Sequence, residues 1–386
     1  MKVAVVTGTR AEYGLLEPLM NKIVSSKKLE LQLIVTGTHL LEDFGSTAEI
    51  ILRDGFTIDG TVPEIGSAST GAAVGRQVGD GVRAFTDKLE ELGPDVVVLL
   101  GDRYELLAAA TAAFFLDIPI LHIHGGEITH GAFDDSIRHA ISKFARVHAV
   151  AALEYAERLI RSGEQPDTVH IVGGMGVDAL ANVSRLSPHE LEVELGIQLH
   201  TPVFIVTYHP VTGAAHDTLN EIRALILALE AFPDATVVLT APNADPEHQD
   251  ILRVLEKSVA VHPNWRLFSS LGTPIYLSLL AEADVVVGNS SSGLLEAPSF
   301  GVPTVNIGPR QGGRLAAASV LSCGAEQNEI EKTIRRALSK EFRDSIKGTV
   351  SPYGKPGATD QIVALLESLR FSKLGAKVYH DSLQNK

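Results

Sequence analysis

A chain with one cysteine cannot form an internal disulfide, and this sequence of 386 residues has only Cys323. It also lacks a Cys-x-x-Cys pair and any cluster of cysteine with histidine, so a structural zinc site is not indicated. Because proteins of reducing compartments rarely contain disulfides, we expect a cytoplasmic protein.

Long apolar runs and an excess of positive charge are missing as well. The longest apolar run, around 106–116, is too short to span a bilayer, and the strand-like residues after Met1 do not resemble a signal peptide. Asp and Glu outnumber Lys and Arg by 47 to 33, and the net charge of −14 argues against broad binding to nucleic acid or anionic membranes. We expect a soluble protein with no nucleic acid and no membrane as partner.

The apolar pattern predicts an α/β protein. Short β-branched runs alternate with longer segments of helical period, which is typical of βαβ units around a parallel sheet. Strands are predicted near 2–7, 30–36, 95–100, 119–123, 147–151, 168–172, 203–207, 235–240, 284–288 and 302–306. Helices are predicted near 13–26, 70–92, 103–116, 135–145, 153–162, 215–231, 246–258, 274–282 and 327–340.

The length suits two domains of about 150–200 residues each. A break at 182–187, followed by a helix start at Pro188, separates a Rossmann-like doubly wound domain over 1–185 from a second over 186–386. A last helix, 359–370, either closes the second domain or crosses back to the first. Because ligands of such sheets bind outside the carboxyl ends of the strands, we expect the two domains to face a central cleft.

The first strand ends in the segment 7–14 (TGTRAEYG), which then enters a helix. The helix-entry amides and the forked cation of Arg10 suit a phosphate, and we take Arg10 and Glu12 as candidate substrate-binding residues. The segment has neither G-x-G-x-x-G nor the P-loop Gly-Lys-Ser/Thr, so neither NAD nor ATP is indicated and no cofactor is expected. The alternative is an ordinary turn with a surface Arg10–Glu12 pair.

Two more predicted strands of the first domain end in ionisable groups. Asp102 and Arg103 follow strand 95–100. Arg103 can keep the Asp102 carboxylate ionised, so that it can act as a base or stabilise a cation. The alternative is a structural ion pair. His124 and Glu127 follow strand 119–123, and Asp134 stands at a helix start, where it could equally be an N-cap. A histidine pair at 122 and 124 without a third ligand points only weakly to metal, and we expect none. A proton-transfer site is favoured.

The second domain carries candidate groups for an anionic nucleotide. Strand 284–288 leads into 288–293 (GNSSSG), where hydroxyls and helix-entry amides make an anion cradle, and Glu296 is suited to a ribose diol. The alternative is an N-cap followed by a surface basic loop. The further candidates are His209 and Asn243, each also compatible with a structural role, and Arg310 and Arg314, which could neutralise a diphosphate.

Together these motifs resemble the hydrolysing UDP-N-acetylglucosamine 2-epimerases of sialic-acid and related nonulosonic-acid biosynthesis, over nearly the whole chain. Their joint order is highly specific. The segments that carry the resemblance are 8–13 (GTRAEY), 101–103 (GDR), 125–127 (GGE), 134–139 (DDSIRH), 209–212 (HPVT), 288–291 (GNSS) with Glu296, and 310–311 (RQ).

The resemblance implies two Rossmann-like domains in the glycosyltransferase-B arrangement, without metal or nicotinamide. It implies that Asp102 and Asp134 are catalytic carboxylates. Relatives with a His-Ile-Glu-Gly-Gly pattern have a third carboxylate where this chain has His124, so either His124 or Glu127 takes that role. Nucleotide contacts are implied for Arg10, Arg103, His209, Asn243, Ser290, Ser291, Glu296 and Arg310.

The implied reaction is loss of UDP with removal of the C2 proton, followed by hydration of the glycal to an N-acetylmannosamine-type sugar. Asp102 and Asp134 are the candidate bases, with Glu127 and His124 assisting the water step. Alternatives are a non-hydrolysing 2-epimerase, a glycosyltransferase of the same architecture, or a nucleotide-sugar sensor. The substrate could be UDP-N-acetylglucosamine, a 2,4-diacetamido-trideoxy sugar or a GDP-linked sugar. A homo-oligomer, dimer or tetramer, is expected.

Overall fold

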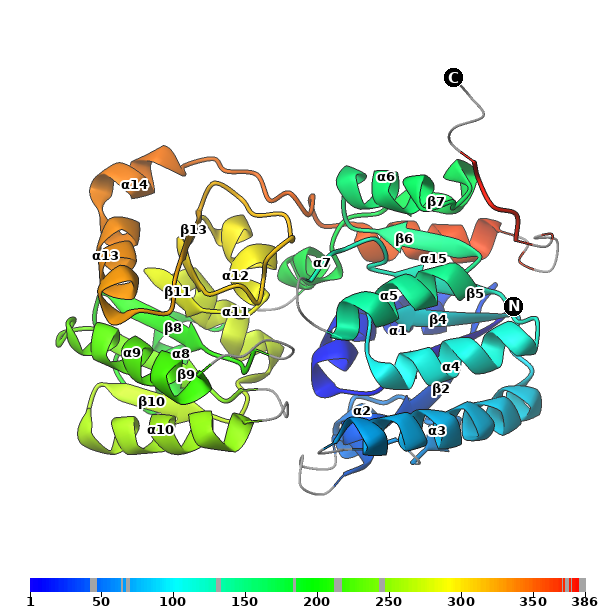
Figure 1. Cartoon of the computed structure of the whole chain (residues 1–386), viewed down its shortest axis with the longest axis horizontal. Helices are drawn as coiled ribbons and strands as arrows, with labels where there is room; N and C mark the ends of the chain where they lie inside the picture. Colours follow the sequence, from blue (N-terminus) through cyan, green and yellow to red (C-terminus); the bar gives the residue numbers. More distant parts are fainter. Residues whose placement is uncertain are drawn as a thin grey trace. The chain divides into compact units, whose positions relative to one another are not determined.

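The computed structural model describes residues 1–41, 47–63, 65–66, 70–129, 133–182, 185–211, 217–242, 247–369, 371, 375 and 377–381. The chain forms two compact units (Figure 1). The first comprises Met1–Glu127, Asp134–Ala179 and Lys355–Lys386, and the second comprises Ile128–Phe133 and Leu180–Gly354. The predicted boundary lies at residue 185; in the structure the chain leaves the first unit after Ala179 and re-enters it at Lys355.

The first unit is built on a seven-stranded parallel sheet in the order β3-β2-β1-β4-β5-β6-β7. The strand order reverses between β1 and β4, and in such sheets ligands bind beside this switch point. The strands are β1 (Lys2–Thr7), β2 (Glu30–Thr36), β3 (Gly60–Val62), β4 (Val96–Leu100), β5 (Ile120–Ile123), β6 (Val147–Val150) and β7 (Val169–Ile171).

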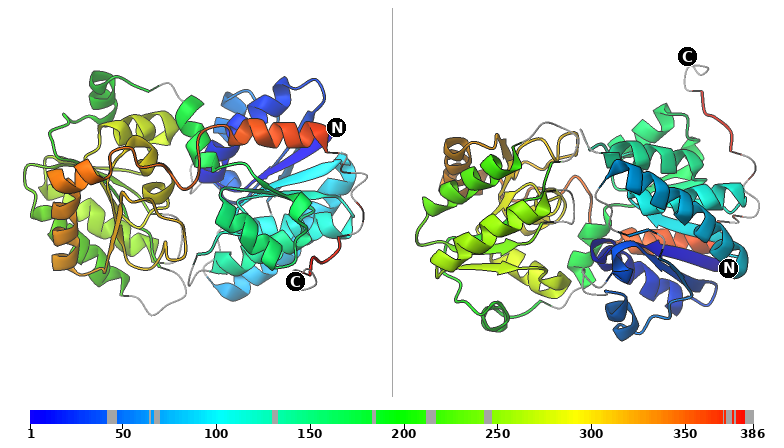
Figure 2. Two further views of the ribbon diagram at one scale, coloured as in Figure 1. Left: turned by 90° about the horizontal axis from the view of Figure 1, so that it is seen from above. Right: turned by 60° about the horizontal axis from the view of Figure 1, so that its bottom comes forward.

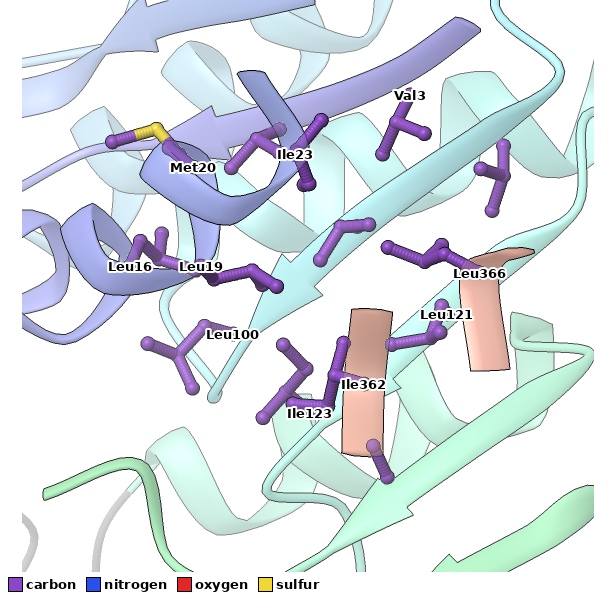
Figure 3. Packing of buried hydrophobic residues seen from close by; sticks show 14 of the residues in the cluster. Val3, Leu16, Leu19, Met20, Ile23, Leu100, Leu121, Ile123, Ile362 and Leu366 are labelled. Atoms are coloured by element: carbon purple, nitrogen blue, oxygen red, sulfur yellow. The ribbon is translucent and has the colours of Figure 1, made fainter. Parts of the chain in front are cut away.

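Helices cover both faces of this sheet. Val3 and Val5 of β1 pack into the cluster that includes α1 and α15, whereas Ala4 and Val6 pack into the cluster with α3, α4 and α5. Figure 3 shows the first of these faces, where α1 and α15 lie over side chains of the strands. The helices are α1 (Arg10–Ser25), α2 (Ala48–Arg53), α3 (Gly71–Leu92), α4 (Tyr104–Phe115), α5 (Phe133–Phe144), α6 (Leu153–Arg161), α7 (Met175–Asn182) and α15 (Ala358–Ser368), with 3-10 turns η1 (Gly37–Leu40) and η3 (Pro166–Thr168).

The second unit repeats the plan on a six-stranded parallel sheet in the order β10-β9-β8-β11-β12-β13. One face packs against α9, α10 and α13 and the other against α8 and α11. The strands are β8 (Val203–Thr207), β9 (Thr236–Thr240), β10 (Trp265–Phe268), β11 (Val285–Gly288), β12 (Thr304–Ile307) and β13 (Val320–Cys323). The helices are α8 (Pro188–Leu195), α9 (Thr218–Glu230), α10 (His248–Val261), α11 (Gly272–Glu282), α12 (Ser292–Leu295), α13 (Gln327–Leu338) and α14 (Lys340–Ser345), with the 3-10 turn η4 (Ala297–Phe300).

The last helix, α15, packs on α1 at the other end of the sequence, as the views of Figure 2 also show. Its place in the first unit is fixed at its first turn, where the buried Asp178 carboxylate of α7 accepts hydrogen bonds from the backbone N–H groups of Gly357, Ala358 and Thr359. A carboxylate on a helix N-terminus satisfies amides that have no partner within the helix.

These sheets confirm the predicted fold class of two Rossmann-like doubly wound α/β domains. The predicted helix start at Pro188 is also confirmed, with a capping box between Ser187 and Glu190. The prediction omitted β3, β10 and β13, which are short strands at the edges of their sheets. Across the described ranges, no helix combines the length and the apolar character needed to cross a membrane.

Candidate active site

The turn between β1 and α1 places Glu12 in a buried position at the switch point of the first sheet. Thr9 is the N-cap of α1 and its side chain accepts from the Glu12 N–H, at 3.3 Å. The Glu12 carboxylate turns back and accepts from the Gly8 N–H at 2.9 Å. Glu12 is therefore a buried group of the turn and does not form the surface pair with Arg10 that was the structural alternative.

Glu12 belongs to a cluster of buried charges that includes a residue the sequence did not single out, Glu105. Arg103 Nε donates to Glu105 Oε1 at 2.7 Å, and a Cβ on Gly8 would lie 2.6 Å from the same oxygen. Burial and the Glu105 charge raise the pKa of Glu12 to about 8, against the opposing effect of Arg103. The cluster thus holds a proton near neutral pH, which lowers the negative charge beside the turn.

Asp102 is paired with Arg138 of α5, which corrects the expectation that Arg103 holds this carboxylate. Arg138 Nη2 donates to Asp102 Oδ2, and the Arg138 side chain is 2% exposed against 20% for that of Asp102. Arg103 is directed to Glu105. A fixed guanidinium on one oxygen orients the carboxylate and leaves part of it open to a ligand.

The end of β5 brings His124 and Glu127 together. His124 Nδ1 lies 2.9 Å from Glu127 Oε1, and both side chains are buried. The Met175 backbone N–H donates to His124 Nε2 at 3.2 Å, so the ring proton sits on Nδ1, the nitrogen nearer to the carboxylate. His124 has a φ of 63°, a backbone strain that is typical of functional positions.

Asp134 stands in the exposed first turn of α5, one helical turn before Arg138. Residues four apart share a helix face, so Asp134 lies on the side of α5 that carries Arg138 and its partner Asp102. Asp135 approaches Arg138 Nη1 and His139 Nε2 at 3.7 Å each. The carboxylates that the structure places at Arg138 are therefore Asp102 and Asp135. Burial alone would lower the pKa of Arg138, but the Asp102 and Glu127 charges raise it.

His122, the other histidine of this strand, is a structural group. Its Nε2–H donates to the Gly101 carbonyl at 2.7 Å, and its Nδ1 accepts from the Ser142 hydroxyl of α5 at 3.0 Å. Complete burial lowers the pKa of His122 to about 3. This bridge fixes the backbone immediately before Asp102 to the helix that carries Arg138.

The carboxyl ends of β8 and β11 are locked together in the second unit. The His209 N–H donates to Asn289 Oδ1 at 2.7 Å, and Asn289 Nδ2 donates to the His209 carbonyl at 2.8 Å. His209 is buried, and burial first and the Arg310 charge second lower its pKa. The imidazole is therefore neutral near pH 7 and beside a cation.

Arg310 reaches the same point of the second sheet. Its Nη1 donates to the Asn289 carbonyl at 3.2 Å, beside the 2.8 Å bond from Gln311 Nε2. Ser290 and Ser291 follow Asn289 directly, so an arginine and two hydroxyl residues lie at the end of β11.

The structure changes one expected detail of this segment, because the helix that follows the serines, α12, is a single turn that passes into η4. Glu296 joins the two and is half-buried, as is Arg314. Asn243 lies outside the described residues.

Sequence reasoning missed Arg138, Glu105 and Asn289 as parts of the site. Each lies inside or next to a motif that was recognised, and Arg138 is four residues after Asp134 on the same helix. This spacing was the available signal for Arg138. Glu105 and Asn289 gave no comparable signal, because their roles depend on contacts between strand ends that are far apart in the sequence.

The family model described as UDP-N-acetylglucosamine 2-epimerase matches residues 21–367. The chain belongs to this family. Among its relatives, a GDP/UDP-N,N'-diacetylbacillosamine 2-epimerase (hydrolyzing) of Campylobacter jejuni is 36% identical over 345 residues, which are 89% of this chain and 89% of the relative. A UDP-N,N'-diacetylbacillosamine 2-epimerase (hydrolyzing) of Legionella pneumophila is 35% identical, over 88% of this chain and 89% of the relative.

The fold of this 2-epimerase family member is shared with solved structures. The crystal structure of UDP-GlcNAc 2-epimerase from Neisseria meningitidis bound to UDP-GlcNAc matches with a TM-score of 0.81 at 19% identity, covering 95% of this chain and 99% of that one. The predicted family and the predicted class of enzyme, a 2-epimerase, are thereby confirmed. The roles of the individual site residues stay predictions.

Proposed function

We propose that the protein is a hydrolysing 2-epimerase, which converts a UDP- or GDP-linked 2-acetamido sugar and water into the nucleoside diphosphate and the free 2-epimer. The observation that carries the proposal is the pair of oriented carboxylates at neighbouring strand ends, Asp102 held by Arg138 and Glu127 facing His124. Relatives named as hydrolysing 2-epimerases, at 36% and 35% identity, support the same reaction.

The nucleotide diphosphate is bound in this proposal by the groups at the end of β11 and by the loop that follows β12. Arg310 supplies charge, and Ser290 and Ser291 supply hydroxyl donors; their backbone is fixed by the Asn289 bridge to His209. Arg314 and Arg10 add positive charge, and Glu296 suits the ribose diol. Asn243 completes the predicted nucleotide contacts.

The first step is elimination. A carboxylate takes the C2 proton, the C2–H electrons form the C1=C2 bond of a glycal, and the C1–O bond breaks so that the diphosphate leaves with its electrons. Asp102 and Asp134 are the proposed groups, one removing the proton and the other stabilising positive charge at C1. Arg138 keeps the Asp102 carboxylate in one orientation for this transfer.

The second step is hydration of the glycal. C2 receives a proton from solvent on the face opposite to the one that lost its proton, and the oxygen of water bonds to C1. The proton that the first carboxylate removed is returned to solvent. Glu127 takes the proton that water releases, and His124 lies beside it with Nδ1 2.9 Å from Glu127 Oε1. In this proposal His124 and Glu127 together replace the carboxylate that relatives with the His-Ile-Glu-Gly-Gly pattern have at the position of His124.

The assay is incubation of the purified protein with UDP-N-acetylglucosamine, UDP-N,N'-diacetylbacillosamine and GDP-N,N'-diacetylbacillosamine in separate reactions, with detection of free nucleotide and free sugar. We expect release of both products without any acceptor, and in deuterated water one deuterium at C2 of the sugar. A product that is still nucleotide-linked would indicate a non-hydrolysing epimerase. Hydrogen retained at C2 would rule out the glycal route.

The proposed setting is the cytoplasm, which the single cysteine of the chain supports. We further propose a homo-oligomer, a dimer or a tetramer, and light scattering of the purified protein would measure its mass directly.

A further inference from the structure

The C-terminal tail after α15 caps the end of the active-site helix α5. Lys377 Nζ donates to the carbonyl oxygens of Ser142, Lys143 and Ala145, at 2.9, 3.0 and 2.7 Å. The last carbonyls of a helix lack partners within the helix, and the helix dipole favours a cation there. One ammonium group from a distant part of the sequence therefore supplies the C-terminal cap of α5.

The residues after Lys377 are fitted against the turn between α6 and β7, near the red end of the ribbon in Figure 1. The His380 N–H donates to the Gly163 carbonyl at 2.8 Å. Gly163 has a φ of 100°, and a Cβ there would lie 2.1 Å from the ring of Tyr379, so glycine is required by both the backbone and the tail. Lys143 Nζ lies 5.6 Å from the centre of the same ring.

A buried carboxylate, Glu164, joins the tail to the sheet. Glu164 contacts Lys377 Nζ at 2.5 Å, Lys143 Nζ at 2.8 Å and His148 Nε2 at 3.0 Å. Burial alone would raise the pKa of Glu164, but these hydrogen bonds lower it to about 2. The carboxylate is therefore ionised across the physiological range and gives the Lys377 ammonium a fixed counter-charge.

Hydrogen bonds connect the C-terminal end of α5, which Lys377 caps, to the proposed catalytic carboxylate Asp102. Ser142, whose carbonyl is bonded to Lys377, donates its hydroxyl to His122, and His122 donates to the carbonyl of Gly101, the residue before Asp102. Along the helix itself, Arg138 is one turn before Ser142 and pairs with Asp102. Both routes start at the cap and end at the same carboxylate.

We propose that Lys377 is a positioning residue, which holds α5 so that Arg138 and Asp102 keep their catalytic arrangement. This role rests on the proposed function, since it matters only if Asp102 acts on the sugar. Nucleotide binding should not depend on it, because the candidate groups Arg310 and Ser290 belong to the second unit and Arg10 lies on α1, not on α5. The expected signature is a loss in kcat without a loss in nucleotide affinity.

The test compares Lys377→Met with Lys28→Met in the full chain. Lys28 is an exposed lysine of the same unit that pairs with Glu367 and does not touch α5. Because small misplacements of reacting groups are costly, we expect Lys377→Met to lower kcat by about 10-fold or more, with KM and the Kd for UDP within about twofold of wild type. Lys377→Arg, which keeps the charge and the donors, should recover most of the loss.

A second variant, Tyr379→Ala, loosens the tail without removing a buried charge, because the Tyr379 side chain is exposed. It should shift kcat in the same direction by a smaller factor. A kcat for Lys377→Met equal to that of Lys28→Met would overturn the proposal, as would an Arg variant as impaired as the Met variant.

Hydrogen exchange of the α5 amides separates this proposal from the proposed function. Faster exchange over 133–144 in Lys377→Met, but not in Lys28→Met, supports the cap even if wild type acts on none of the three nucleotide-sugars. In that case the proposed function fails and the structural role stands. Unchanged exchange in Lys377→Met would overturn the cap whatever the activity.

Discussion

The buried Glu12 carboxyl makes stability depend on pH. Burial and the Glu105 charge raise the pKa of Glu12 from 4.5 to about 8. Between these two values the folded chain keeps a proton that the unfolded chain releases, so stability falls as the pH rises. The contribution of the protonated Glu12 is complete below pH 4.5 and is lost as the pH rises through 8.

We expect Glu12→Gln to remove this dependence, because the amide is neutral at every pH and its oxygen can still accept from the Gly8 N–H. Urea unfolding from about pH 5 to about pH 8 should show the wild type losing up to about 1.4 kcal/mol per pH unit relative to the variant. The exposed Glu49→Gln serves as the control. Parallel pH profiles for wild type and Glu12→Gln would show that Glu12 is ionised in the folded protein.

Asp102 is the residue whose removal should affect the chemistry most. Asparagine keeps the shape but cannot take a proton, so Asp102→Asn should lower kcat by a factor of about 10² to 10⁴. The exposed Asp80→Asn of the same unit is the control. Thermal unfolding of both variants checks the fold, because the substitution also leaves the buried Arg138 without its carboxylate partner. A kcat within about tenfold of the control would exclude Asp102 as the base.

At the scale of elements, the sequence predicted helices and strands best where a single short pattern identifies the element. Continuous β-branched runs marked β1, β4, β8 and β11, all of which are buried on both faces. The short strand β13 was missed, because none of its four residues is fully buried and they show no such run. Helix α1 begins earlier than the predicted residue 13, because Thr9 caps it.

For the candidate site, the sequence located the groups at the strand ends but not the residues that they contact. Strand ends located Asp102, His124 and Glu127, since groups after parallel strands meet at one edge of the sheet. The partners of these groups come from other elements, and a pattern along one segment carries no information about them. Arg138 replaced Arg103 as the partner of Asp102 for this reason.

The cap that Asp178 gives to α15 should be a major contribution to the stability of the first unit. Asp178 is 3% exposed and its two oxygens accept from three consecutive backbone N–H groups. In Asp178→Asn an NH₂ group replaces one of these acceptors, and we expect a loss of about 1.5–3 kcal/mol in the free energy of unfolding. Urea denaturation measures this loss.

Asp360 of the same helix gives the matched control for that measurement. Its side chain is 72% exposed and its ion pair with Lys22 is at the surface, so Asp360→Asn should cost less than about 1 kcal/mol. If the two substitutions cost the same, the carboxylate of Asp178 does not support α15 more than a surface charge does.

For the whole molecule, the repeated βαβ pattern was enough to predict two doubly wound domains. The return of the chain to the first unit at Lys355 was left open, since the apolar stripe of α15 fits the face of either sheet equally well by pattern alone. It is settled by particular contacts, above all the Asp178 cap and the packing of Ile362 and Leu366 against α1.

Nucleotide binding should stabilise the whole chain by mass action. At about 100 times its Kd, UDP should raise the free energy of unfolding by about 2.7 kcal/mol, which thermal unfolding detects as a rise in Tm. In Arg310→Gln the rise should be much smaller, because a cation that meets the diphosphate is lost. The fold should persist, since Gln311 still donates to the Asn289 carbonyl at 2.8 Å.

Arg335→Gln on the exposed face of α13 is the control, because this arginine pairs with Glu331 at the surface and lies over the ring of Phe232. Equal UDP-induced shifts in Tm for the two variants would remove Arg310 from the nucleotide site. If GDP raises the Tm of the wild type as much as UDP does at equal concentration, the binding energy comes from the diphosphate and ribose rather than the base. In that case substrate specificity would be determined by contacts to the sugar, which we expect to be made by the groups around Asp102 and Asp134.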